Sequence, residues 1–208
     1  IKTLAIPEGI TEIGDYAFEC CARLTSASFP STLRKVGMGA FSGCVMLKSV
    51  SVSEGITEFG DGAFYFCRRL AGFAFPKSVT HVGDYMFAEC TSLKEVTFEE
   101  GLTQISERMF WKCDQLQRVL LPQSLTAIGD LAFSRCEMLS ECLIPAGVTS
   151  IGAYAFRSCG SLTSVTFPAD TVKEYTFCGC YCMEEVTLSD QVTTIEPYAF
   201  SGAASTEE

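Results

Sequence analysis

Apolar side chains recur along this chain with a spacing of 23 residues. Each unit opens with an aliphatic residue, Leu in most units, and carries an aromatic residue 17 positions later, or 15 in the eighth unit. The units start at residues 1, 24, 47, 70, 93, 116, 139, 162 and 183, and the eighth is shortened to 21 residues. The aromatic positions are Phe18, Phe41, Phe64, Phe87, Phe110, Phe133, Phe156, Phe177 and Phe200. Such a period predicts a stacked repeat array in which equivalent side chains contact one another.

The opening segment of each unit alternates apolar with small or polar residues. Val50 and Val52, or Val96 and Phe98, show this period of two, which indicates a β-strand with one buried face. Every unit runs the strand in the same chain direction, so we expect one parallel β-sheet along one face of the array. Proline closes this strand in six units, where a missing backbone donor suits a corner.

The second half of each unit has apolar residues three apart, such as Ile10 and Ile13, followed in most units by a glycine. Glycine there suits a tight corner with a positive φ. An aspartate often comes next and is a good N-cap. We therefore expect a short helical turn that carries Phe18 and Cys21 on its inner face. The predicted fold class is α/β: a right-handed solenoid of nine repeats with a sheet on one face and helical turns on the other.

Most of the 12 cysteines follow the same period. Eight of them stand three residues after the aromatic position, at Cys21, Cys44, Cys67, Cys90, Cys113, Cys136, Cys159 and Cys180. A thiol is small and usually buried, so a column of free cysteines behind the Phe column is expected. Cys142 takes an inward strand position and is expected in the core. Cys20, Cys178 and Cys182 lie outside the column, where a local disulfide and a surface thiol are both open.

The recurring pattern L-x-x-V-x-F-P-x-x-V-T-x-I-G-x-Y-A-F-x-x-C resembles the BspA-like leucine-rich repeat over essentially the whole chain. The sequence contains no Asn, the residue that forms a ladder in ordinary leucine-rich repeats. The resemblance implies a cell-surface or secreted protein of bacterial or protozoan type with a role in adhesion. Two units depart from the pattern: the fifth has Ser106 where Gly is usual, and the eighth has Lys173 there and lacks two residues. Local irregularities are expected at both.

Charge and composition narrow the classes of function. With 25 acidic and 15 basic residues the formal net charge is −10, the wrong sign for holding a phosphate backbone, so nucleic acid is not expected as a partner. No apolar run is long enough to suggest a membrane span. The chain begins without an initiator Met or signal peptide and reads as one domain, residues 1–208, cut from a longer protein.

Stacked repeats usually bind through the extended surface they create, so the outward strand positions are the first candidates. Most are small, and only the fifth to seventh units combine charge with apolar groups. The candidate binding residues on this sheet face are Glu95, Thr97, Arg118, Leu120, Glu141 and Leu143. An ordinary solvated face with cross-strand pairing of Glu and Arg is the alternative.

A second candidate surface lies on the expected helical face, where Tyr65, Phe66 and Trp111 form an aromatic patch. Catalysis would have to use His81, the only imidazole, with Cys67 or Cys90, and no nucleophile, P-loop or zinc motif accompanies it. We therefore predict a non-enzyme without cofactor or metal. The predicted function is a surface module that binds a host matrix or cell-surface protein, or a glycan. The alternatives are a structural spacer and, more remotely, a thiol-dependent enzyme.

Overall fold

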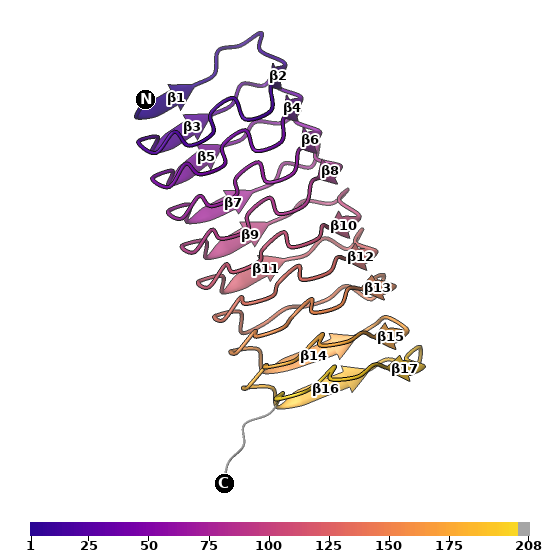
Figure 1. Ribbon diagram of the computed structural model, residues 1–208. Helices are drawn as coiled ribbons and strands as arrows, with labels where there is room; N and C mark the ends of the chain where they lie inside the picture. The colour runs from indigo at the N-terminus through magenta and orange to yellow at the C-terminus, as the bar shows by residue number, and fades with distance from the viewer. Residues whose placement is uncertain (204–208) are drawn as a thin grey trace.

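The computed structural model describes residues 1–203 as a parallel β-solenoid of about eight turns with a leucine-rich-repeat fold. Figure 1 shows an elongated stack with the two termini at opposite ends and two columns of short strands along its length. The repeated units of the sequence therefore form one continuous stack. The count of nine repeats is not confirmed as nine turns, and residues 204–208 lie outside the described part of the chain.

The expected parallel sheet forms along the front of the solenoid, from the opening segments of the units. Register pairs residues one unit apart, such as Thr3 with Ser26 and Ala27 with Val50. The front strands are β1 (Thr3–Ala5), β3 (Ser26–Ser28), β5 (Ser49–Ser51), β7 (Gly72–Ala74), β9 (Glu95–Thr97), β11 (Arg118–Leu120), β14 (Ser164–Phe167) and β16 (Glu185–Leu188).

A second column of two-residue strands runs down the side of the solenoid and was not predicted. Its inward residues, such as Ile13 and Val36, are buried, and they pair in register. Because each strand is only two residues long, its alternation is too short to see in the sequence. The side strands are β2 (Glu12–Ile13), β4 (Lys35–Val36), β6 (Glu58–Phe59), β8 (His81–Val82), β10 (Gln104–Ile105), β12 (Ala127–Ile128), β13 (Ser150–Ile151), β15 (Thr171–Val172) and β17 (Thr194–Ile195).

The third face consists of turns, and the prediction of helical turns is wrong: residues 1–203 contain no helix, so the fold is all-β rather than α/β. Two residues of each turn segment have positive φ, for example Tyr16 at 56° and Cys20 at 54°. Every second backbone N–H of this segment donates to a carbonyl of the next unit. Tyr16 N donates to the Met38 carbonyl (2.8 Å) and Phe18 N to the Ala40 carbonyl (2.8 Å). These bonds join successive units, which helical turns could not do because their N–H groups point along the helix axis.

The predicted aromatic column is confirmed as the spine of the core. Neighbouring rings stack with centroids 5.2 to 5.9 Å apart, from Phe18–Phe41 to Phe177–Phe200. The Leu column is buried beside it, as at Leu47 and Leu93, and Cys142 is buried as predicted. Seven members of the cysteine column are buried, and Cys21, in the first unit, is half-buried.

The glycines at the corner before the turn segment, present in six of the nine units, were expected to provide a positive φ but have a different role. These glycines do not have positive φ. A Cβ at Gly83 would lie 2.4 Å from the backbone N of Asp61, and one at Gly152 would lie 2.3 Å from the backbone N of Asp130. Close approach of the preceding unit, rather than backbone conformation, explains why glycine is used at these corners.

Both strand columns are interrupted. The side column is broken between β8 and β10 and between β13 and β15, and the front column between β5 and β7 and before β14. Residues 141–143 make only one bridge, between Glu141 and Arg118. The irregularities predicted for the fifth and eighth units coincide with the two breaks of the side column. The front breaks had no signal in the sequence.

Candidate functional sites

The six residues predicted on the sheet face lie together on three adjacent units. Register places Arg118 beside Glu95 on one side and Glu141 on the other, and Leu120 beside Thr97. None of the ion pairs within residues 1–203 includes Arg118. The cross-strand pairing offered as the alternative is therefore not formed within 4 Å, and the guanidinium is free to contact a partner.

The two leucines of this sheet-face patch are exposed. Leu120 is 41% exposed and Leu143 is 73% exposed, because the middle position of each strand points inward and its neighbours point outward. Leu143 also borders a groove of about 400 Å³ that extends over Ser164 and Thr166 of β14. The groove lies where the front column is interrupted before β14. The structure thus places an exposed apolar pair, an unpaired cation and a hollow next to one another.

The aromatic patch predicted on the opposite side lies on the turn face. Tyr65, Phe66 and Trp111 are all half-buried. Arg68 lies 4.0 Å from the centre of the Phe66 ring, and Lys112 lies 4.1 Å from the Trp111 ring. Two of the three rings, Phe66 and Trp111, therefore each have a cation of the chain itself over one face.

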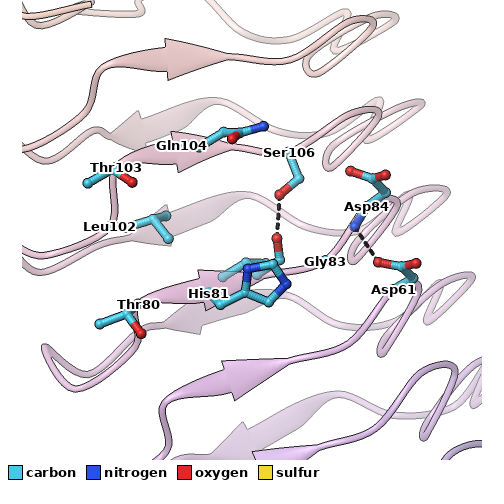
Figure 2. Close-up of a pocket in the computed structure, with 10 residues that line it drawn as sticks. Asp61, Thr80, His81, Gly83, Asp84, Leu102, Thr103, Gln104 and Ser106 are labelled. Carbon is cyan, nitrogen blue, oxygen red and sulfur yellow. Dashed lines mark hydrogen bonds between the residues drawn. The ribbon is translucent and has the colours of Figure 1, made fainter.

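A corner cleft of about 200 Å³ opens between β8 and β10 (Figure 2). At the glycine corners from Gly37 onward the backbone N–H bonds to the unit before, as Gly129 N does to the Ile105 carbonyl at 2.8 Å. In the fifth unit the Ser106 hydroxyl donates to the Val82 carbonyl instead. At those glycine corners the backbone of the preceding unit lies against the glycine, whereas here a serine side chain stands between the two units and the side column is interrupted.

His81 lies on the edge of this cleft and is exposed. Its proposed thiol partners, Cys67 and Cys90, are fully buried in the core and do not line the cleft. Burial raises the pKa of both thiols well above the ordinary value, which disfavours a thiolate nucleophile. The arrangement does not bring together the base and nucleophile that thiol catalysis requires.

The cysteines outside the column form neither a disulfide nor a metal site in the described part of the chain. Cys20 and Cys182 are exposed and Cys178 is half-buried, and all three are free thiols. Cys180 belongs to the buried column. Within residues 1–203, no three His, Cys, Asp or Glu side chains come close enough to hold a metal ion.

Sequence reasoning missed a groove of about 340 Å³ on the turn face, between Tyr16 and Tyr85. Tyrosine recurs at this turn position in other units, where Tyr154, Tyr175 and Tyr198 stack with ring centres 4.8 and 5.0 Å apart. Gly39 and Gly62 replace tyrosine at the two units in between. The replacement of tyrosine by glycine in two successive units is the sequence feature from which the groove could have been predicted.

A stack of parallel strand units of this length, joined by turns around Leu and Phe columns, defines a leucine-rich-repeat protein. A family model described as "BspA type Leucine rich repeat region (6 copies)" matches residues 1–94, 61–173 and 170–208. The chain therefore belongs to the BspA-type leucine-rich-repeat family. A comparison with curated proteins gave no match.

Solved structures show the same fold. A T. pallidum leucine-rich-repeat protein is 32% identical over 77% of this chain and 78% of that one, with a TM-score of 0.74. A leucine-rich cell-surface protein from Faecalibacterium prausnitzii is 27% identical over 94% of this chain, with a TM-score of 0.71. The matched region spans 65% of that protein's length. A Bacteroides ovatus leucine-rich-repeat protein, 24% identical with a TM-score of 0.56 over 96% of this chain and 72% of that one, shares the fold.

These similarities place the chain among leucine-rich-repeat proteins, which are generally non-enzymatic, and a cell-surface protein is among its structural relatives. Residues 1–203 contain no helix long and apolar enough to cross a bilayer.

Proposed function

We propose that this chain is a non-enzymatic protein-binding module of a cell-surface adhesion protein, and that its sheet face over the fifth to seventh units holds the partner. The observation that carries the proposal is the exposed pair Leu120 and Leu143 beside Arg118, which forms no ion pair with any side chain of residues 1–203. The centre of a protein interface is more apolar than the rest of the surface, and arginine is enriched there. The adjoining groove of about 400 Å³ offers space for a partner side chain.

The rest of the sheet face supports this choice of region. The first three front strands present mostly serine, threonine and alanine, as at Ser26, Ser28 and Ser49. Small side chains provide little area for a partner to bury. A spacer without a ligand would be expected to keep such residues along the whole face, whereas the fifth to seventh units do not.

The test measures binding to an array of extracellular matrix proteins, cell-surface proteins and glycans. The variant Arg118→Ala/Leu120→Ala should weaken binding to any protein that responds by about 30-fold, as expected for loss of an interface centre. Ser28→Ala/Ser51→Ala, on the same sheet face, is the matched control and should bind like the unaltered protein. An array with no response would favour the structural spacer, and unchanged binding by Arg118→Ala/Leu120→Ala would place the interface elsewhere.

A further inference from the structure

The groove on the turn face exists because two tyrosines are missing from a column. Gly39 and Gly62 stand where Tyr16 and Tyr85 have their rings. The Tyr16 ring lies over Gly39, since a Cβ there would be 2.5 Å from Tyr16 Cδ1. At Gly62 a Cβ would meet nothing closer than 3.5 Å, so the space above this residue is open. Tyr65 and Trp111 also line the groove, and Asp61 supplies its carboxylate.

Several aromatic side chains of the turn face, including Tyr85 and Trp111 at the groove, lie against a cation of the chain. Arg108 lies 5.2 Å from the Tyr85 ring centre and forms an ion pair with Glu107. Lys112 lies over Trp111 and forms an ion pair with Glu89 at 3.3 Å. Arg157 lies 5.7 Å from the Tyr154 ring. These sets show the grouping that this face repeatedly builds: an aromatic ring and a cation, twice with an acid beside them.

The lining of the groove contains aromatic rings and an acid, and the cations that contact two of these rings, Arg108 on Tyr85 and Lys112 on Trp111, lie outside that lining. Within residues 1–203, neither lysine nor arginine is among the residues that line it. Arg108 comes from the following unit, and its guanidinium donates a hydrogen bond to the Tyr85 hydroxyl. One oxygen of Asp61 accepts the Asp84 N–H at 2.9 Å, which leaves the second oxygen available. The pKa of Tyr65 is raised by burial and then by the Glu89 carboxylate, with Arg68 opposing, so its phenol keeps its proton and can donate a hydrogen bond.

We propose that this groove binds the guanidinium of an arginine presented by a basic segment of a partner protein. A guanidinium is planar, stacks on aromatic faces and donates several hydrogen bonds at once, which suits the lining residues Tyr65, Tyr85 and Asp61. The groove is shallow and open along the face, so the side chain can enter while its backbone stays outside. The net charge of −10 attracts basic partners over longer distances. This site is independent of the proposed sheet-face interface.

The test uses blocked pentapeptides with a central arginine, citrulline, lysine or an alanine. Trp111 is the only tryptophan and lines the groove, so its fluorescence reports occupancy directly. The arginine peptide should change the Trp111 emission with saturation, and the citrulline peptide, which has nearly the same shape but no charge, should bind at least tenfold more weakly. Binding of the arginine peptide should weaken as salt is raised.

One variant should block the groove without disturbing the fold. Gly62→Tyr restores the tyrosine column, and its φ of 57° matches that of Tyr85 at 58° and Tyr154 at 60°. This variant and Asp61→Asn should each lose at least tenfold in affinity for the arginine peptide. Tyr198→Ala, at the same turn position but outside the groove, is the matched control and should bind normally. Arg118→Ala/Leu120→Ala should also bind the peptide normally, which separates this site from the sheet face.

Three outcomes would overturn the proposal. Equal binding of the arginine and citrulline peptides would show that the groove does not select a cation. Tighter binding of the lysine peptide would show that an ammonium, not a guanidinium, is the preferred ligand. No change in Trp111 emission or in the NMR amide spectrum with arginine peptide up to about 10 mM would show that no cation site exists.

Discussion

Each buried cysteine of the column makes one hydrogen bond that no aliphatic side chain could make. The Cys67 thiol donates to the Phe41 carbonyl at 3.2 Å, in the unit before it, and that carbonyl also accepts the backbone N–H of Cys44. The same bond recurs at 3.1 to 3.2 Å for Cys44, Cys90, Cys113, Cys136, Cys159 and Cys180. Cysteine therefore serves as a small core residue that joins successive units, and its role needs neither a disulfide nor reactivity.

These thiols make the stability of the fold sensitive to alkaline pH. Burial raises the pKa of Cys44, Cys142 and Cys180 to about 12, from an ordinary value of 9.0. Burial disfavours the charged thiolate. Each of these thiols therefore holds its proton more tightly in the folded state than in the unfolded state. Stability is complete below about pH 9 and falls as pH rises toward 12, by about 1.4 kcal/mol per pH unit for each thiol. Urea unfolding under reducing conditions at about pH 8 and pH 10.5 measures this loss.

A cysteine variant separates this effect from the titration of other groups. Cys142→Ala removes one buried thiol, so the variant should be less stable at about pH 8 and should lose less stability than the unaltered protein by pH 10.5. Equal losses in the two proteins would contradict the assignment of the alkaline sensitivity to buried thiols.

At the scale of the element, the sequence predicted the front strands and the core columns but not the turns. The alternation Val96, Thr97, Phe98 has a single interpretation, because only a strand places alternate residues on one face. The segment that includes Phe18 and Cys21 is compatible with two backbones, since residues three apart share a face in a helix and also in this chain of turns. Hydrogen bonds to the next unit, such as that from Tyr16 N to the Met38 carbonyl, stabilise the turn backbone rather than the helix. Such bonds depend on the stack and cannot be read from one unit.

The candidate sites, too, could be predicted from the sequence only in part. The sheet-face residues could be placed on adjacent units from the period alone, because strand residues in register are neighbours. The groove beside Leu143 could not, since it depends on the interrupted pairing before β14. The cations over Phe66 and Trp111 were not predicted either. Their positions depend on the side-chain conformations of Arg68 and Lys112, which the sequence does not specify.

The corner glycines allow a comparison within one molecule. Gly14 and Gly152 occupy the same position of their units, but only Gly152 has a preceding unit against it. Gly152→Ala should reduce the free energy of unfolding by about 1 to 3 kcal/mol, because its Cβ would lie 2.3 Å from the backbone N of Asp130. Gly14→Ala should be nearly neutral, since a Cβ there has no neighbour within 4 Å. Chemical denaturation of the two variants measures the difference, and similar losses in both would refute the close-approach explanation.

At the scale of the whole molecule, the junction between the seventh and eighth units is the weakest of the stack. Both strand columns are interrupted there, in front between residues 141–143 and β14 and at the side between β13 and β15. The turn face still joins the two units, through bonds such as that from Phe156 N to the Thr176 carbonyl at 2.9 Å. The aromatic stack also continues from Phe156 to Phe177. Each remaining junction within residues 1–203 keeps at least one of its two strand columns in register.

This arrangement predicts that β14 to β17 open as a group, separately from the rest of the solenoid. Units of a repeat array are stabilised mainly by their neighbours, so a junction that lacks both ladders lowers the cost of detaching everything beyond it. Native-state amide hydrogen exchange should give residues 164–195 a common opening free energy. That value should be lower than the one for β1 to β6 at the other end, where both columns are continuous over the first three units. Equal protection at the two ends would mean that the Phe stack and the turn-face hydrogen bonds, rather than the strand ladders, determine how strongly neighbouring units are coupled.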